Sequence, residues 1–222
     1  MNRQSLRSIF SKVAVPACFL GPIVMTAADI ITIVLNHKAN PLKQTISDFA
    51  IGPYGYLEKI GMIMVAISFL FIAINLLIVR NNKELRIFKF VGVLFVIVAL
   101  GFVMISIFST NIIGTLINFH GLVHQVSAIA VSVVFYLACL ILMRLMINKT
   151  SLRYFGLYCA LTCFVGFIVL LALGFSHNKN EYMGLMERII AGFNLVWIVL
   201  VGPQVIRLAR SIQNGIISRR QE

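Results

Sequence analysis

The chain has 222 residues, of which 60% are hydrophobic and only 12% are charged, with a formal net charge of +12 and a mean hydropathy of +0.97. Because average soluble proteins carry roughly 25% charged residues, this chain has too little polar surface to cover a globule of its size. The composition excludes a soluble enzyme, a nucleic-acid-binding module and a secreted disulfide-rich protein, and it indicates a protein of the lipid bilayer.

Six apolar segments are long enough to cross a bilayer. A hydrocarbon core about 30 Å thick needs roughly 20 apolar residues in a helix, and helices are required because unpaired backbone groups are costly in lipid. In chain order the predicted spans are Val13–Leu35, Ile60–Val79, Phe90–Phe108, Phe119–Met143, Tyr154–Phe175 and Ile189–Ile206. We therefore expect an all-α fold, a polytopic bundle of six transmembrane helices in one domain, residues 1–222, with short basic tails at 1–12 and 207–222.

The positive charges are distributed unevenly between the loops. Most of the 19 Lys and Arg residues lie at the ends of the chain, between spans two and three, and between spans four and five: Arg3, Arg7, Lys12, Arg80, Lys83, Arg86, Lys89, Arg144, Lys149, Arg153, Arg207, Arg210, Arg219 and Arg220. Short cytoplasmic loops carry an excess of Lys and Arg. The pattern predicts a multi-pass protein of the cell (cytoplasmic) membrane with both termini in the cytoplasm. Membrane lipids, not nucleic acid, are the expected partners.

Polar residues gather at the opposite, predicted outer, ends of the spans. Charged groups inside a membrane are costly, so each is a functional hypothesis. They are Asp29 in span one, Ser47 and Asp48 in the first outer loop, Glu58 and Lys59 at the start of span two, Asn111 after span three, His120 and His124 at the start of span four, and Glu187 and Arg188 before span six. Any functional site is therefore expected at this outer face.

His120 and His124 form the most informative spacing. Residues four apart project from one helix face and can present two imidazoles to one metal ion. The pair lacks the Glu of a His-Glu-x-x-His motif, and hydrogen-bonded packing residues are the alternative interpretation. A zinc site, if present, would consist of His120, His124 and a carboxylate, with Asp48 as the first choice.

Two further features have open alternatives. The first outer loop, with Ser47, Asp48 and a Gly-Pro-Tyr-Gly turn at residues 52–55, is either a re-entrant or capping loop or a turn in which Ser47 or Asp48 caps a short helix. Asp29 is either a buried, hydrogen-bonded acid or the partner of Arg188. A structural ion-pair network across spans one, two and six is at least as consistent with these residues as catalysis.

The segment Ile46-Ser47-Asp48 with Gly52-Pro53-Tyr54-Gly55, followed by Phe108 to Asn111 and then His120-Gly121-x-x-His124, resembles the prokaryotic membrane family catalogued as domain of unknown function 998. The resemblance covers most of the chain and implies the same six spans and motif order, but no activity. Members often have an acid where this chain has Asn111. If that acid is a metal ligand, the resemblance implies that the third ligand here is Asp48, Asp29 or Glu187.

Two functions remain open at this point, and with them the question of whether the chain is an enzyme. The first is binding or transport of a small molecule or lipid, or a structural subunit, with Arg188, Asp29 and Asn111 lining an outward polar cavity. The second is a membrane-embedded, zinc-dependent hydrolase of a lipid or amphiphile from the outer leaflet. In that case Asp48 or Glu187 serves as ligand or general base, and Ser47 orients the water or the scissile group. The sequence leaves the oligomeric state open.

Overall fold

The computed structural model describes residues 3–79, 85–111, 116, 118–175 and 181–218 of the chain. Its elements are α1 (Arg3–Leu35), α2 (Ile46–Phe49), α3 (Gly55–Leu77), α4 (Arg86–Ile107), α5 (Phe119–Met146), the 3-10 helix η2 (Thr150–Leu152), α6 (Arg153–Phe175), α7 (Met183–Leu200) and α8 (Gly202–Ser218). These ranges contain no β-strand. The predicted all-α class is confirmed.

The six predicted spans are also confirmed. Within the described ranges, the helices long and apolar enough to cross a membrane are Lys12–Leu35, Gly55–Leu77, Arg86–Ile107, Phe119–Met146, Thr150–Ala172 and Met183–Gln213. The chain is thus a multi-pass membrane protein. The basic residues Arg80, Lys83, Lys179, Arg219 and Arg220, on which the predicted orientation partly depends, lie outside the described residues.

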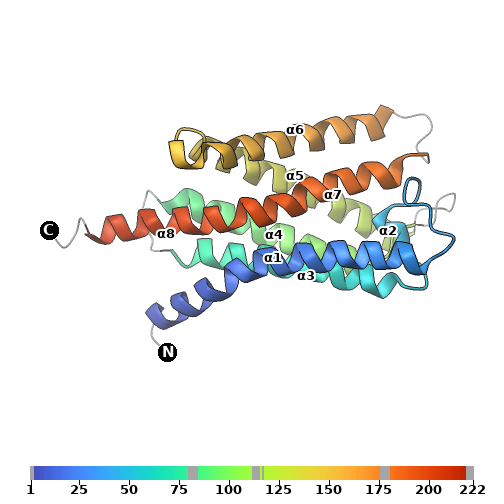
Figure 1. The fold of residues 1–222 in the computed structure, drawn as a ribbon, viewed down its shortest axis with the longest axis horizontal. Coiled ribbons are helices and arrows are strands. Elements are labelled where there is room, and N and C mark those ends of the chain that lie inside the picture. Colours follow the sequence, from blue (N-terminus) through green and yellow to red (C-terminus); the bar gives the residue numbers. More distant parts are fainter. Residues whose placement is uncertain (1–2, 80–84, 112–115, 117, 176–180, 219–222) are drawn as a thin grey trace.

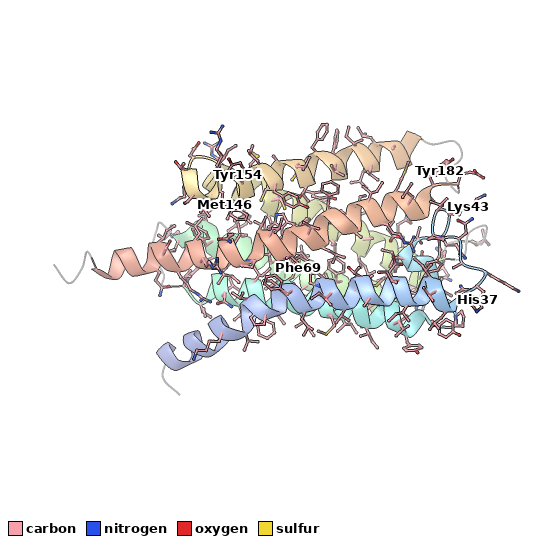
Figure 2. The ribbon with its side chains drawn as sticks, in the orientation of Figure 1. His37, Lys43, Phe69, Met146, Tyr154 and Tyr182 are labelled. Carbon is pink, nitrogen blue, oxygen red and sulfur yellow. The ribbon has the colours of Figure 1, made fainter. Side chains whose placement is uncertain are left out.

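The long helices form a bundle in which neighbours in sequence are neighbours in space (Figure 1). α1 packs on α3, α3 on α4, α4 on α5, α5 on α6 and α6 on α7, and a contact between α1 and α7 closes the arrangement. The start of α1 and the end of α8 lie at one end of the bundle, and α2 lies at the other (Figure 1). We call these the terminal end and the α2 end. His37, Lys43 and Tyr182 mark the α2 end, whereas Met146 and Tyr154 lie toward the terminal end (Figure 2).

Two helix boundaries differ from the predicted spans. α3 begins at Gly55, before the predicted start at Ile60, so that Glu58 belongs to the helix. The sixth span is interrupted, because α7 ends at Leu200 and α8 begins at Gly202. Pro203 has no N–H to donate to a carbonyl one turn earlier, which explains the break.

Small residues bring α1 and α3 close together. Gly21 lies against the α3 backbone, where an added Cβ would be 2.6 Å from the Met64 carbonyl oxygen. The Ser68 hydroxyl donates a hydrogen bond to the Ala17 carbonyl at 2.7 Å. Small residues at such contacts permit close approach of membrane helices. The contact places the last turns of α1 beside the first turns of α3 at the α2 end.

An aromatic cluster fills the middle of the bundle. The ring centroid of Phe69 lies 5.5 Å from that of Phe95 and 5.6 Å from that of Phe135, and Trp197 stands edge-on to Phe135 at 5.1 Å. The Trp197 indole N–H donates to the buried Cys159 sulfur at 3.2 Å. Aromatic rings from α3, α4, α5 and α7 thus pack against one another. This packed cluster supports the helix ends that form the α2 end.

Candidate functional site

The short helix α2 is stabilised by its own side chains. Thr45 is its N-cap: the Asp48 amide donates to Thr45 Oγ1 at 2.9 Å, and the Thr45 amide donates to Asp48 Oδ2 at 2.8 Å. This reciprocal pair is a capping box. The structure therefore shows the short capped helix that was one of the two alternatives, with Thr45 as the cap. Asp48, predicted as a metal ligand or base, has one carboxylate oxygen committed to this turn.

Arg188 ties the loop between α1 and α3 to α7. Its Nε and Nη2 donate to Asp29 Oδ2 and Oδ1 at 2.9 and 2.8 Å, a bidentate ion pair in which the two side chains are 17% and 16% exposed. Nη1 lies within hydrogen-bonding distance of three carbonyl oxygens, those of Pro41, Gln44 and Gly184, at 2.9, 2.8 and 3.1 Å. Of the two alternatives for Asp29, the structure shows the ion pair. The guanidinium fork is occupied within the protein, so a substrate would compete with Asp29 for it; the substrate-binding roles of Arg188 and Asp29 stay predictions.

A second, exposed pair connects the same two segments at the rim. Lys43 Nζ lies 2.9 Å from Glu181 Oε1, and both side chains are about half exposed. The hydrogen bond to Glu181, and secondarily its negative charge, raise the pKa of the Lys43 ammonium. Exposed pairs of this kind contribute little to stability, so we assign the fastening of this loop to Arg188.

Ser47, His124 and Glu187 meet behind α2. Ser47 Oγ lies 3.0 Å from His124 Nε2 and 3.3 Å from Glu187 Oε1. The other carboxylate oxygen of Glu187 accepts the Ile46 amide at 2.6 Å. Ser47 and His124 are both buried, with 9% and 6% exposure. Three of the predicted site residues, from α2, α5 and α7, are thus brought together.

The hydrogen bonds of His124 determine its tautomer. His124 Nδ1 lies 2.8 Å from the carbonyl oxygen of Phe108, and a carbonyl can only accept, so Nδ1 must carry a proton. In the neutral ring, Nε2 then has a free lone pair and accepts the Ser47 hydroxyl proton. In the charged ring, Nε2 donates to Ser47, which donates to Glu187. Either way, both ring nitrogens of His124 have partners.

His120 does not join this group. Its side chain is exposed, and its ring packs 5.3 Å from the ring of Phe108. In the described part of the chain, no three His, Cys, Asp or Glu residues are placed to hold one metal ion. With the Nε2 of His124 occupied by Ser47 and Asp48 in its capping box, the donors do not fit the predicted zinc site of His120, His124 and Asp48. We therefore derive no chemistry from a metal.

Asn111 supports the turn before α5. Its Oδ1 accepts the Asn118 amide at 3.2 Å, and its amide group packs on Gly121, where an added Cβ would collide with it. Asn118 in turn caps α5 by accepting the Gly121 amide at 2.8 Å. These contacts give Asn111 a local packing role, and its predicted substrate-binding role stays a prediction.

Glu58 was noted among the polar residues of the predicted outer face but was given no role in the predicted site. It is 0% exposed, and neither carboxylate oxygen has a hydrogen-bond partner in the described part of the chain. The Thr32 hydroxyl, 2% exposed and also without a partner of standard geometry, lies beside it, and Asp29 is close enough to interact electrostatically. The single Thr32 hydroxyl can donate to one Glu58 oxygen at most, so the other carboxylate oxygen has no hydrogen-bond donor among the described residues between α1 and α3.

The sequence does contain a signal for Glu58. The buried face of α3 includes Gly55, Glu58, Gly61, Met62 and Val65. These positions recur at intervals of three and four residues, the spacing of one helix face. A carboxylate within such a stripe of small and apolar residues is expected to be covered by a neighbouring helix.

The family model described as "Protein of unknown function (DUF998)" matches residues 19–203. This range contains every residue of the site described above. No curated protein and no solved structure matches the chain.

Proposed function

The chain belongs to the DUF998 family, whose description assigns no activity, and from its geometry we propose that it binds or transports a small molecule or lipid headgroup carrying a positive charge or an N–H donor. The proposed binding group is the Glu58 carboxylate, with the Thr32 hydroxyl beside it. The proposal places the site at the α2 end, among the ends of α1, α3 and α7.

The observation that supports this function is the unsatisfied burial of Glu58. An isolated carboxylate in an apolar interior is strongly disfavoured unless a proton, a cation or hydrogen-bond donors compensate it. Arg188 is the nearby cation, but its bidentate bond to Asp29 leaves it committed elsewhere. A ligand that brings its own positive charge or donors is the missing partner.

The charge balance of the region favours a cation over an anion. Asp29, Glu58 and Glu187 supply three carboxyl groups, and Arg188 and His124 are the basic side chains joined to this network. An anionic ligand would have to displace Asp29 from Arg188. A cationic ligand meets a Glu58 that has no salt bridge among the described side chains.

We propose further that the α2 end faces out of the cell. Among the described basic residues, Arg86, Lys89, Arg144 and Arg153 lie at helix ends that face the terminal end, and Arg207 lies within α8. Such residues mark the cytoplasmic side. A C-terminal green fluorescent protein fusion that fluoresces, and an alkaline phosphatase fusion that is inactive, are the expected results.

Two other functions are less well supported by the geometry. A zinc hydrolase would need a convergent set of donors, and the residues that the structure describes do not supply one. A purely structural subunit predicts that Glu58 is a protonated core residue, whose replacement by Gln changes no ligand response. The binding proposal predicts a response that depends on the carboxylate.

The test combines carbodiimide labelling with thermal unfolding of detergent-purified protein. Dicyclohexylcarbodiimide reacts with buried carboxyl groups, and peptide mass spectrometry locates the adduct. We expect Glu58 to be modified, and expect at least one of Na⁺, Mg²⁺, ethylammonium or dodecylammonium to slow this reaction. The same probe should raise the melting temperature of the wild type and of Glu181→Gln, an exposed carboxylate control, but not of Glu58→Gln. If no cation protects Glu58, or if Glu58→Gln responds like the wild type, the proposal is wrong.

A further inference from the structure

We propose that Ser47 is a nucleophile activated by His124, which accepts the acyl group of an ester, and that the esters in question carry an apolar chain. This activity needs no metal and does not depend on a ligand at Glu58.

The geometry of the pair is that of an activated serine. A nucleophile and a base within about 2.6–3.2 Å, with the base oriented by a third group, define such a site. Ser47 Oγ and His124 Nε2 are 3.0 Å apart, and the Phe108 carbonyl holds Nδ1 at 2.8 Å. Because this carbonyl fixes the proton on Nδ1, the neutral ring directs its lone pair at the Ser47 hydroxyl.

The pair is held rigidly by three separate elements. Ser47 lies on α2, which is fixed by its capping box and by the Glu187 bond to the Ile46 amide. His124 lies on the second turn of α5, and Phe108 follows the end of α4. Catalytic groups act best when their support is preorganised.

Glu187 has a defined place in the charge balance of the reaction. When His124 accepts the Ser47 proton, an imidazolium forms in a buried setting. Glu187 Oε1 lies 3.3 Å from the same serine oxygen. While the Ser47 hydroxyl donates to Nε2, a protonated Glu187 can donate to Ser47 Oγ, and once the ring is charged an ionised Glu187 stabilises it electrostatically. We regard Glu187 as a positioning and electrostatic residue, since it acts through Ser47 and Ile46.

The proposed reaction balances with water as co-reactant. Ser47 Oγ forms a bond to the ester carbonyl carbon while its proton moves to His124 Nε2. The bond from that carbon to the alcohol oxygen breaks, and the alcohol leaves with the proton from Nε2. Water then attacks the acyl-serine, gives its proton to Nε2, and the Ser47 oxygen leaves and regains that proton. The products are a carboxylic acid and an alcohol, with the protein unchanged.

The surroundings favour an ester with an apolar chain. Next to His124, α5 presents large apolar side chains outward, with Phe119, Leu122 and Val126 being 69%, 50% and 57% exposed. In a membrane these side chains contact lipid acyl chains. Ser47 itself is only 9% exposed, which limits access of bulk water and favours an amphiphile that approaches within the bilayer at the α2 end.

The test is labelling with a long-chain alkyl fluorophosphonate, which reacts with activated serines. The full chain in detergent is incubated with the probe, and peptide mass spectrometry locates the adduct. We expect one adduct, on Ser47, that is lost when the protein is heat-denatured first. A positioned general base contributes about 100-fold or more to such reactions, so His124→Gln should slow labelling at least about 100-fold.

The matched control is Ser106→Ala. Ser106 is a buried serine near the end of α4 whose hydroxyl donates to the Val103 carbonyl at 2.8 Å. This variant should be labelled at the wild-type rate. If the His124→Gln variant does not fold, the test rests on the wild type alone, that is, on which serine of the folded protein carries the adduct. A folded wild type that remains unlabelled at Ser47, or that labels Ser47 no faster than the denatured chain, would overturn the proposal.

Discussion

Replacing Arg188 with alanine tests the fastening of the α2 end. Arg188 makes two bonds to Asp29 at 2.9 and 2.8 Å, and three carbonyl oxygens lie within 3.1 Å of its Nη1. Both charged side chains are less than one-fifth exposed, so solvent screening is small. Removing one partner of a buried ion pair costs about 3–5 kcal/mol, because the other charge is left uncompensated. We expect Arg188→Ala to lower the free energy of unfolding by this amount.

The assay is reversible unfolding in mixed micelles of increasing dodecyl sulfate fraction. The double variant Asp29→Leu, Arg188→Met removes both charges and should be less destabilised than Arg188→Ala, since apolar replacements of a buried pair are often neutral or better. Lys43→Ala, which removes the exposed ion pair, should leave unfolding unchanged. A loss below about 1 kcal/mol for Arg188→Ala, the size of an exposed pair, would refute the reasoning. So would a double variant no more stable than Arg188→Ala.

Three further predictions concern the same region. Glu58→Gln should raise the melting temperature in ligand-free detergent, by the equivalent of about 1 kcal/mol, because it replaces a buried ionisable group, whose charged form is costly in an apolar interior, with a neutral amide of similar shape. Gly121→Ala should cost about 1–3 kcal/mol in the micelle assay, because the new methyl collides with Asn111, whereas Gly192→Ala, with open space around it, should cost nothing. Thr45→Ala should cost about 1 kcal/mol through loss of the cap, and limited proteolysis of the loop at 36–54 should accelerate.

Hydropathy predicted the six spans well, because a bilayer constrains the length and composition of every span, whereas the orientation inferred from charge placement stays a prediction. The spacing of polar residues predicted the site less well. His120 and His124 share a helix face by spacing, yet one is exposed and the other buried. Spacing along one helix says nothing about how far the neighbouring helices extend, and the cover over His124 comes from α2 and the end of α4.

The ion pair between Asp29 and Arg188 shows a second limit of prediction from the sequence. Asp29 and Arg188 are separated by 159 residues, and the sequence offered this pair only as one alternative. Arg188 is recognised as structural once its carbonyl contacts are known, and these depend on the path of an irregular loop. Glu58 could have been placed on a covered face from the stripe on α3. That Glu58 lacks hydrogen-bond partners among the described residues could not be predicted, because this depends on which side chains of α1 reach it.

The contacts of Arg188 also have a consequence for the time during synthesis at which the α2 end can form. Asp29 is synthesised 159 residues before the arginine that neutralises it, which at about 5–20 residues per second corresponds to roughly 8–30 s. Glu187 likewise accepts a hydrogen bond from the amide of Ile46, which is synthesised 141 residues earlier. Until the last span enters the membrane, the loop at 36–54 lacks both of these attachments. The first spans must therefore be inserted with an uncompensated acid, and any chain that terminates before Met183 lacks the residues that close this end of the bundle.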